Sequence, residues 1–225
     1  MKKVLALHGF LGSSGDFDSL KKSFVEPELD FHALDLFQLW KQGIRTKEKV
    51  FKYIVENFSN STLVGYSMGG RILGELFSRD PGFFKGLCLI SSGDGLRSTN
   101  QEQMRGDFES HWLHKFSTEA PQKVLNDWNS LPIFDSDTGL VDAKTLKLDP
   151  VYLEFQLKVL GRQRQSPYFS KISRMPNVVF ICGRFDLKYR AYTSDFRNSY
   201  VINGGHRLLK SGDIDKLRQI LEKLL

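Results

Sequence analysis

Short apolar runs alternate along the chain with segments in which apolar residues recur every three or four positions. The short runs predict buried strands, because they are bounded by turn residues and are too short for helices. They lie at residues 4–7, 31–36, 61–65, 86–91, 177–182 and 200–202. The periodic segments predict helices: one opened by Thr46, one that follows Ser67, and one that begins at Ile214. This alternation predicts an α/β protein with a mostly parallel sheet of about six strands and helices on both faces.

Residues 95–170 break this alternation. Aromatic and aliphatic residues recur there at helical spacing around Trp112 and Trp128, and a further helix is expected from Pro150, since proline is favoured at the first helical position. No stretch of this segment has convincing strand character. We interpret it as a helical lid inserted into a core of residues 1–94 and 171–225, and not as an independent domain.

Composition narrows the classes of function. The chain has 225 residues, of which 40% are hydrophobic and 26% are charged, as expected of a globular enzyme with one core. The net charge of +6 is concentrated in residues 166–225, which hold 11 lysines and arginines against 5 acidic residues. No dense basic run with interleaved aromatics occurs there, so we expect no nucleic-acid partner. This excess of basic residues indicates a solvated basic face, with a mild attraction for anionic substrates at most.

The two cysteines and the N-terminal residues bear on the compartment. Cys88 and Cys182 lie inside apolar runs and have neither metal-ligand nor CxxC spacing, which indicates reduced thiols and no metal site. The first apolar run ends at His8 and is too short for a signal peptide, and no stretch is long enough to span a membrane. We predict a cytoplasmic protein that does not insert into a membrane and that is a monomer or a weak homo-oligomer.

The pentapeptide Gly65-Tyr66-Ser67-Met68-Gly69 matches the pattern G-x-S-x-G. It lies between a predicted strand and a predicted helix, the context in which this pattern forms a strained turn, which we call the elbow, that projects the serine hydroxyl from the carboxyl end of a sheet. Glycines stand two positions before and after the serine, at Gly65 and Gly69, because the tight turn leaves no room for side chains there. The pattern and its context predict an α/β-hydrolase fold with Ser67 as the reactive residue.

The loop after the first strand, His8-Gly9-Phe10, is expected beside this turn. In this architecture such a loop offers a backbone N–H to an oxyanion. We therefore predict that the amides of Phe10 and Met68 form an oxyanion hole. His8 itself is interpreted as a structural residue.

A reactive serine needs a base, and the base needs an orienting acid; in this fold they follow in the chain order serine, acid, histidine. His206 lies in a glycine-rich loop between the last predicted strand and the last helix, where it can reach Ser67. Asp186, directly after the preceding strand, is the preferred acid. Asp94 is the alternative, because some enzymes of this fold place the acid after the earlier strand. Asp195 falls in a helical segment and is disfavoured.

Beyond these fold-wide motifs, the chain resembles the 2-succinyl-6-hydroxy-2,4-cyclohexadiene-1-carboxylate (SHCHC) synthases of menaquinone biosynthesis. The resemblance runs in register over most of the chain. Its more particular elements are Arg71 directly after the elbow, the lid pattern Trp128-x3-Pro132-x-Phe134, and the pattern Asp186-x-Lys188-Tyr189.

This resemblance implies a lyase that eliminates pyruvate from 2-succinyl-5-enolpyruvyl-6-hydroxy-3-cyclohexene-1-carboxylate to give SHCHC. It implies that His206 and Asp186 activate Ser67 to remove a carbon-bound proton, without a metal or an organic cofactor. The substrate carries three carboxylates, so the partner is a small polycarboxylate.

Four residues match positions that line the pocket in the family. They are Tyr66, Arg71, Arg105 and Trp128. Arginine suits a carboxylate because its planar fork donates two parallel hydrogen bonds. Each residue also has a structural interpretation; Arg71, for example, could pair with Glu75 one turn along its helix. We interpret Lys188 as a structural ion-pair partner.

One position departs from the family, which has a further lid arginine before the helix expected at Pro150. This chain has Thr145 or a lysine there, Lys144 or Lys147, depending on the alignment gap. Arg162 and Arg164 lie farther along and are candidates to replace it.

Two other functions remain open. The same three residues would serve a serine carboxylester hydrolase, with the lid selecting the acyl group. A non-catalytic receptor on this fold is a third possibility, but a binding protein has no need of an intact serine, histidine and aspartate.

Overall fold

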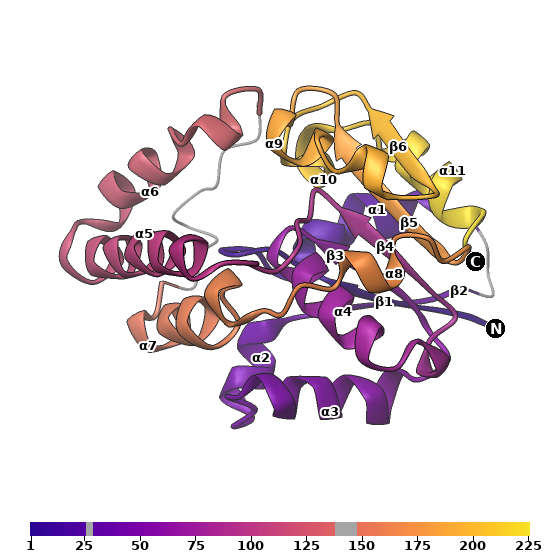
Figure 1. The fold of residues 1–225 in the computed structure, drawn as a ribbon, viewed down its shortest axis with the longest axis horizontal. Helices are drawn as coiled ribbons and strands as arrows, with labels where there is room; N and C mark the ends of the chain where they lie inside the picture. Colours follow the sequence, from indigo (N-terminus) through magenta and orange to yellow (C-terminus); the bar gives the residue numbers. More distant parts are fainter. Residues whose placement is uncertain (26–28, 138–147) are drawn as a thin grey trace.

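The computed structural model describes residues 1–25, 29–137 and 148–225, and its centre is a six-stranded parallel sheet (Figure 1). The strands run in the spatial order β2-β1-β3-β4-β5-β6, and every recorded pairing is parallel. Their bounds are β1 Lys2–Leu7, β2 Leu29–Leu34, β3 Thr62–Tyr66, β4 Gly86–Ile90, β5 Val178–Gly183 and β6 Ser199–Ile202. The predicted sheet of about six strands is confirmed.

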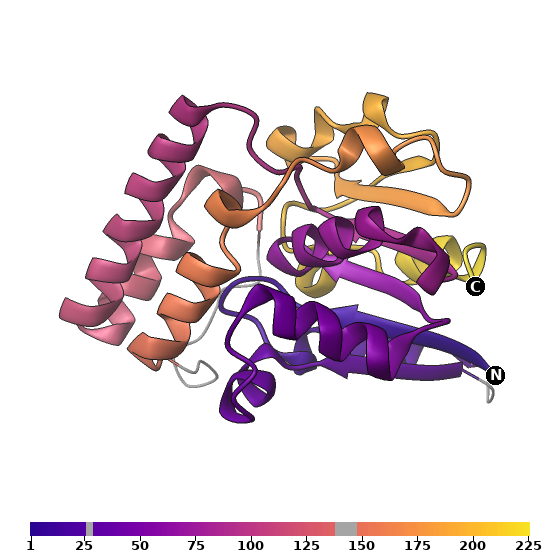
Figure 2. The same cartoon turned by 60° about the horizontal axis from the view of Figure 1, so that its bottom comes forward.

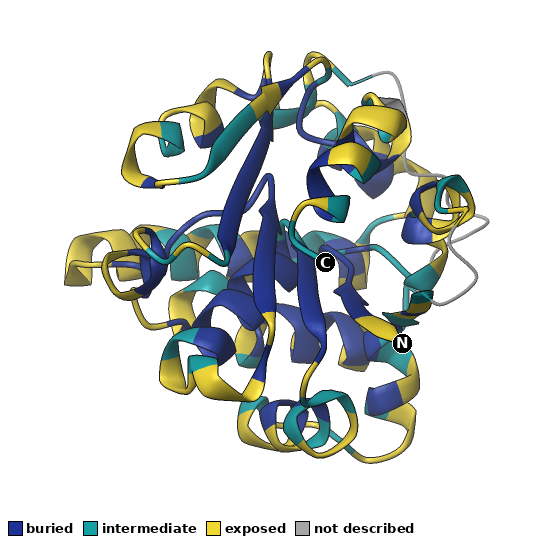
Figure 3. Ribbon diagram, turned by 90° about the vertical axis from the view of Figure 1, so that its right-hand side faces the viewer, coloured by how far each residue is buried: buried dark blue, intermediate teal, exposed yellow. Residues whose placement is uncertain are grey.

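Helices cover both faces of the sheet, because successive side chains of a buried strand point to opposite faces. In β1, Leu5 and Leu7 belong to one apolar cluster and Val4 and Ala6 to the other. The first cluster includes residues of α2 (Leu36–Lys41), α3 (Lys47–Phe58), α4 (Met68–Arg79) and α8 (Phe169–Ile172). The second includes residues of α1 (Asp18–Ser23), α10 (Leu208–Ser211) and α11 (Ile214–Glu222). Figure 3 shows the buried strands between helices whose outer faces are exposed.

Between β4 and β5, the described part of residues 95–170, which we call the lid segment, forms a helical block beside the carboxyl ends of the strands (Figure 2). It contains α5 (Thr99–Thr118), α6 (Pro121–Asn129), the turn η3 (Pro132–Phe134), α7 (Pro150–Glu154), the π-helical turn η5 (Phe155–Val159) and the 3₁₀ turn η6 (Arg162–Arg164). The lid segment has an apolar cluster of its own that includes Trp112 and Trp128. Its described residues contain no strand.

Short elements complete the fold. They are η1 (Ser14–Phe17), η2 (Pro81–Phe83), α9 (Leu187–Arg190) and η7 (Thr193–Asp195). Most of these turns, and the short helices α1, α2, α8 and α10, are not predicted from the hydrophobic pattern, because four to six residues give too few repeats of a helical period. Within the described part of the chain, no helix is both long and apolar enough to cross a membrane.

The strand order places a crevice at one end of the sheet. The chain starts at β1, adds β2 on one side and then continues with β3 on the other, so the loops after β1 and β3 leave in different directions. Ligands of open α/β sheets bind at such a switch point, beyond the carboxyl ends of the strands. Leu7 at the end of β1 lies next to Gly65 near the end of β3, so the loop containing Phe10 and the turn containing Ser67 flank this point.

Candidate active site

Ser67 occupies the strained turn that its sequence context predicts. Its backbone has φ 50° and ψ −110°, in the left-handed region that a residue with a side chain rarely adopts. Neighbouring strands and α4 crowd the turn. A side chain at Gly65 would collide with the Gly70 backbone, and one at Gly69 would collide with the carbonyl oxygens of Leu7 and His8. The small residues of the pentapeptide are therefore required by close backbone packing.

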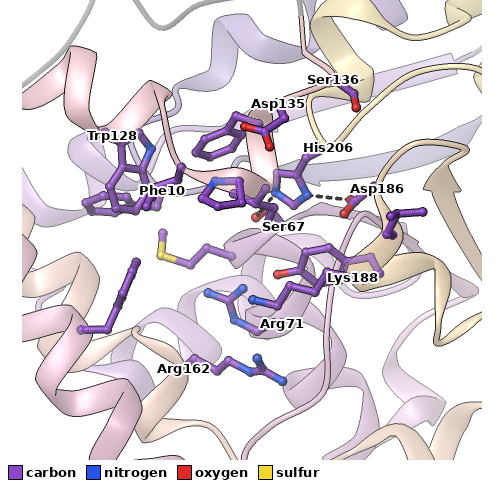
Figure 4. Close-up of a pocket in the computed structure, with 18 of the residues that line it drawn as sticks. Phe10, Ser67, Arg71, Trp128, Asp135, Ser136, Arg162, Asp186, Lys188 and His206 are labelled. Atoms are coloured by element: carbon purple, nitrogen blue, oxygen red, sulfur yellow. Dashed lines mark hydrogen bonds and ion pairs between the residues drawn. The ribbon is translucent and has the colours of Figure 1, made fainter.

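Ser67, His206 and Asp186 form a continuous hydrogen-bonded chain (Figure 4). His206 Nε2 lies 3.1 Å from Ser67 Oγ, and His206 Nδ1 lies 2.8 Å from Asp186 Oδ2. With Nδ1–H donating to the carboxylate, Nε2 is free to accept the serine proton. Asp186 and His206 are each only 3% exposed, which excludes competing water from their hydrogen bond.

Asp94, the alternative acid, is engaged elsewhere. Its Oδ1 accepts hydrogen bonds from the backbone N–H groups of Gly95, Tyr168 and Phe169 at 2.9, 2.7 and 3.1 Å. Its Oδ2 pairs with the guanidinium of Arg97 at 2.7 Å. The carboxylate therefore ties the start of the lid segment to its end, and Asp186 is the aspartate that contacts His206.

Three aromatic rings surround the imidazole of His206. Tyr189 stacks on it with ring centroids 5.0 Å apart, and Phe134 and Tyr66 lie at 5.7 and 5.8 Å. Such packing restricts the rotation of the imidazole and keeps Nε2 directed at Ser67. Sequence reasoning does not reveal the contact from Phe134, because it arises from a turn about 70 positions away in the chain.

The two amides expected to form an oxyanion hole lie in the predicted elements. Met68 is the first residue of α4, where a helix leaves its N–H groups without internal partners, and Phe10 follows β1. Neither amide donates a recorded hydrogen bond within the described residues. Both residues line the same cavity as Ser67. His8 lies outside this lining: its Nε2 accepts from Leu36 N–H, and its Nδ1 donates to the Gly9 carbonyl.

A cavity of about 670 Å³ opens next to Ser67, between the sheet and the lid segment. One part of its wall is apolar, with Phe10, Phe108 and Trp128 among the lining residues. Another part carries four cationic side chains, which we call the cation cluster: Arg71, Arg105, Arg162 and Lys188. Figure 4 shows Arg71, Arg162 and Lys188 on one side of Ser67, and Asp135 and Ser136 on the other.

Arg71 is buried and has no counter-ion among the residues that the structure describes. Its side chain lines the cavity, and its Nε donates to Gln165 Oε1, a neutral acceptor, at 2.9 Å. Glu75, the helical partner considered from the sequence, pairs instead with Lys47 and Arg79, at 2.8 Å each. Burial, together with the charges of Arg105 and Arg162, lowers the pKa of Arg71 to about 10.

Arg105 and Lys188 extend the cluster in different ways. Arg105 donates through Nε to the buried carboxylate of Glu109 at 2.7 Å, so it is held in place by one acid. Lys188 has no ion pair among the described residues, so its interpretation as a structural ion-pair partner is wrong for this part of the chain. The reason is local: Lys188, on α9, lines the cavity, where Arg71, Arg105 and Arg162 are charged neighbours. Tyr189 acts to raise the pKa of Lys188. Desolvation and the charges of the three arginines outweigh this effect and hold that pKa below its ordinary value.

The two aromatic candidates lie in different places. Trp128 lines the large cavity and packs edge-on against Phe10, with ring centroids 5.0 Å apart. Tyr66 is absent from that lining and instead borders a smaller adjoining cavity of about 60 Å³. The alternation of β3 explains this position, because Tyr66 points to the same face of the sheet as Val64, toward the second apolar cluster.

Other sequence candidates fall outside the cavity or outside the described residues. Thr145, Lys144 and Lys147 lie in the part of the chain that is not described. Arg164 is exposed and does not line the cavity, whereas Arg162 does. Among the residues that the structure describes, no group of three or more His, Cys, Asp or Glu side chains is placed to hold a metal ion.

No family model matches the chain, but curated proteins do. It is similar to the putative SHCHC synthase of Haemophilus influenzae, with 27% identity over 217 residues, 87% of this chain and 85% of that protein. An SHCHC synthase of Escherichia coli is 28% identical over 241 residues, 97% of this chain and 93% of that protein. The resemblance to SHCHC synthases predicted from the sequence motifs is confirmed by these relatives.

Solved structures share the fold. MenH from S. aureus superposes with a TM-score of 0.79 at 18% identity, covering 100% of this chain and 93% of that one. A thermophilic esterase from Thermogutta terrifontis gives a TM-score of 0.65 at 13% identity, covering 99% of this chain and 89% of that one. A putative α/β hydrolase family protein from Desulfitobacterium hafniense gives a TM-score of 0.66 at 14% identity, covering 99% and 95%. The predicted α/β-hydrolase fold is confirmed.

Proposed function

We propose that this protein eliminates pyruvate from 2-succinyl-5-enolpyruvyl-6-hydroxy-3-cyclohexene-1-carboxylate to give SHCHC, a step of menaquinone biosynthesis. One observation carries the proposal beyond the resemblance. A hydrogen-bonded serine, histidine and aspartate open onto the same cavity as four cationic side chains. A base beside a cluster of cations suits a proton abstraction from a substrate with several carboxylates.

The reaction needs a base at a carbon next to a ketone. His206 Nε2 accepts the proton of Ser67, and Ser67 Oγ takes the ring proton next to the succinyl carbonyl. The electrons of the broken C–H bond form a new ring double bond, and the existing double bond shifts by one position. The bond from the ring to the enolpyruvyl oxygen then breaks, and that oxygen leaves with its electron pair. Protonation turns the departing enolate into pyruvate.

Negative charge develops on the succinyl ketone oxygen when the proton is removed. We assign its stabilisation to the amides of Phe10 and Met68, since fixed donors cost no reorganisation as charge appears. Arg71 and Arg105 would bind substrate carboxylates, with Trp128 against the ring. Tyr66 would act from behind the elbow, through its contact with His206 and not with the substrate.

A serine carboxylester hydrolase is the second candidate. It is favoured by the same three residues and by the shared fold of the Thermogutta terrifontis esterase. The cation cluster distinguishes the two, because simple acyl groups do not require several cations beside the serine.

A product assay tests the proposal. The purified protein should release pyruvate from the enolpyruvyl substrate. The release is measured by coupling it to lactate dehydrogenase. Ser67→Ala should lower the rate by about 10³-fold or more, as for other members of such triads. Ser194→Ala, at an exposed serine of η7, serves as the matched control. Brisk hydrolysis of p-nitrophenyl acetate without pyruvate release would assign the esterase function instead.

The cytoplasmic location and the monomeric or weakly associated state stay predictions, as does the division into a core and an inserted lid. Analytical ultracentrifugation of the purified protein tests the oligomeric state.

A further inference from the structure

Arg162 is held at the cavity by contacts to both the lid segment and the core. Its backbone N–H donates to Glu109 Oε1 at 3.0 Å, the oxygen that also accepts from Arg105 Nε at 2.7 Å. Its own Nε donates to the backbone carbonyl of Asp94 at 2.9 Å. One buried carboxylate therefore fixes the two lid elements that carry arginines, and the side chain of Arg162 reaches back to the loop after β4.

The guanidinium of Arg162 retains unused donors. A guanidinium has five N–H groups. Within the described residues, Arg162 uses Nε for the Asp94 carbonyl and Nη2 for a long contact of 3.4 Å to the Tyr192 hydroxyl, and it has no ion pair. The nearby carboxylate of Asp94 is already paired with Arg97. Arg162 thus presents a partly buried charge and N–H groups to the cavity, with no counter-ion in the described part of the chain.

The position of Arg162 beside other cations has an energetic consequence. Arg162 is one of the charges that lower the pKa of Arg71. Like charges gathered in a half-closed cavity repel one another, and a bound anion removes that repulsion while it gains hydrogen bonds. An arrangement of this kind is stable only because the surrounding contacts enforce it, and such arrangements are characteristic of binding sites.

Arg164, two positions along the chain from Arg162, does not face the cavity. A 3₁₀ helix has three residues per turn, so Arg162 and Arg164 in η6 point to different sides. Arg164 is exposed and lies outside the cavity lining, and its carbonyl accepts from Lys47 Nζ at 2.6 Å. The structure therefore separates two arginines that the sequence leaves equivalent.

We propose that Arg162 is a further carboxylate-binding residue of the active site, which receives one carboxylate of the substrate next to Arg71. Its fork donates two N–H groups to the two carboxylate oxygens, a geometry that a lysine cannot reproduce. This inference rests on the proposed function for the identity of the substrate, but not for the existence of the anion site.

Two measurements on one set of variants test the inference. In the pyruvate-release assay, Arg162→Ala should raise KM by about tenfold or more with a much smaller change in kcat, as expected for loss of a carboxylate contact. Arg162→Lys should restore part of the loss, because it keeps the charge without the fork. Arg164→Ala should behave as the wild type.

In the second measurement, citrate is added as a tricarboxylate probe, and its stabilisation of each protein is followed as a rise in Tm.

The two readouts separate failure of the inference from failure of the proposed function. Citrate should raise the Tm of the wild type and of Arg164→Ala, and raise that of Arg162→Ala much less. If no variant releases pyruvate but this citrate pattern holds, the proposed function fails and the anion site stands. Equal citrate stabilisation in all variants, or a fall in kcat and Tm of Arg162→Ala without a rise in KM, would show a structural role and overturn the inference.

Discussion

At the scale of single residues, two aspartates show how neighbours decide the role of a side chain. Asp94 and Asp186 each follow a strand of the sheet, and each is 3% exposed. Asp94 meets three backbone N–H groups and an arginine, so it holds two ends of the lid segment together. Asp186 meets the imidazole of His206. The same carboxylate is structural in one position and, in our proposal, orients a base in the other.

Alanine substitutions at these aspartates should therefore affect different properties: turnover for Asp186 and stability for Asp94. Asp186→Ala should lower kcat by about 10³- to 10⁴-fold, because the imidazole loses the partner that fixes its tautomer and direction. Asp94→Ala should lower the free energy of unfolding by about 2–4 kcal/mol, since several buried donors lose their acceptor. Both quantities are measured on each variant, kcat by pyruvate release and stability by urea unfolding. A large loss of kcat in a stably folded Asp94→Ala, with Asp186→Ala near normal, would reverse the assignment.

At the scale of elements, the lid segment contacts the loop that carries His206. Arg207, the next residue, has its guanidinium 3.9 Å from the Phe134 ring centroid and donates to Asn129 Oδ1 at 2.6 Å. Its backbone N–H donates to Asp137 Oδ1 at 2.9 Å. Phe134 also contacts the imidazole itself. The position of the His206 imidazole is thus set jointly by the glycine-rich loop and by the lid segment.

Arg207→Ala should consequently impair turnover more than substrate binding. We expect kcat to fall by about 10- to 100-fold, because small displacements of a catalytic group cost that much. KM should change little, since Arg207 does not line the large cavity. Arg218→Ala on α11, which removes an arginine paired with Glu222 on the surface, is the control. An unchanged kcat in Arg207→Ala would show that the lid segment does not position His206.

At the scale of the whole molecule, the cation cluster is assembled from parts that are distant in the chain. Arg71 belongs to α4, which packs on one face of the sheet. Arg105 belongs to α5, and Arg162 belongs to the turn η6. The lowered pKa of Arg71 is a product of this assembly, because burial and the charges of the two lid arginines all disfavour its charged form. A bound carboxylate has the opposite effect and raises that pKa.

Substrate affinity should therefore depend on pH in the alkaline range. Arg71 is charged below its pKa of about 10, so KM should be constant up to about one unit below this value and should rise above it. Steady-state KM is measured from pH 8 to pH 11. Arg71→Ala should have a higher KM at pH 8 and should lack this rise, whereas Lys188→Ala should retain it. The same alkaline rise in Arg71→Ala would exclude Arg71 as its source.

The sequence by itself determined the fold and the candidate residues of the site. Strands and helices of sufficient length follow from hydrophobic period, and the strain of the turn at Ser67 follows from the glycines around it, because both are local properties of the chain. Chain order and strand ends also place Asp186 and His206 at the edge of the sheet that carries Ser67. The resemblance to SHCHC synthases, carried by short motifs, supplied the substrate class.

Only the tertiary structure decided which side chains meet. It selected Asp186 over Asp94 as the partner of His206, placed Tyr66 behind the elbow, and turned Lys188 and Arg162 into the cavity while Arg164 faces solvent. The physical reason is that these contacts join residues tens of positions apart, and the direction of each side chain depends on the packing of the lid segment against the sheet. The position of the Ser67 hydroxyl thus follows from the residues next to it in the sequence. The side chains that surround this hydroxyl are set by the packing of distant segments.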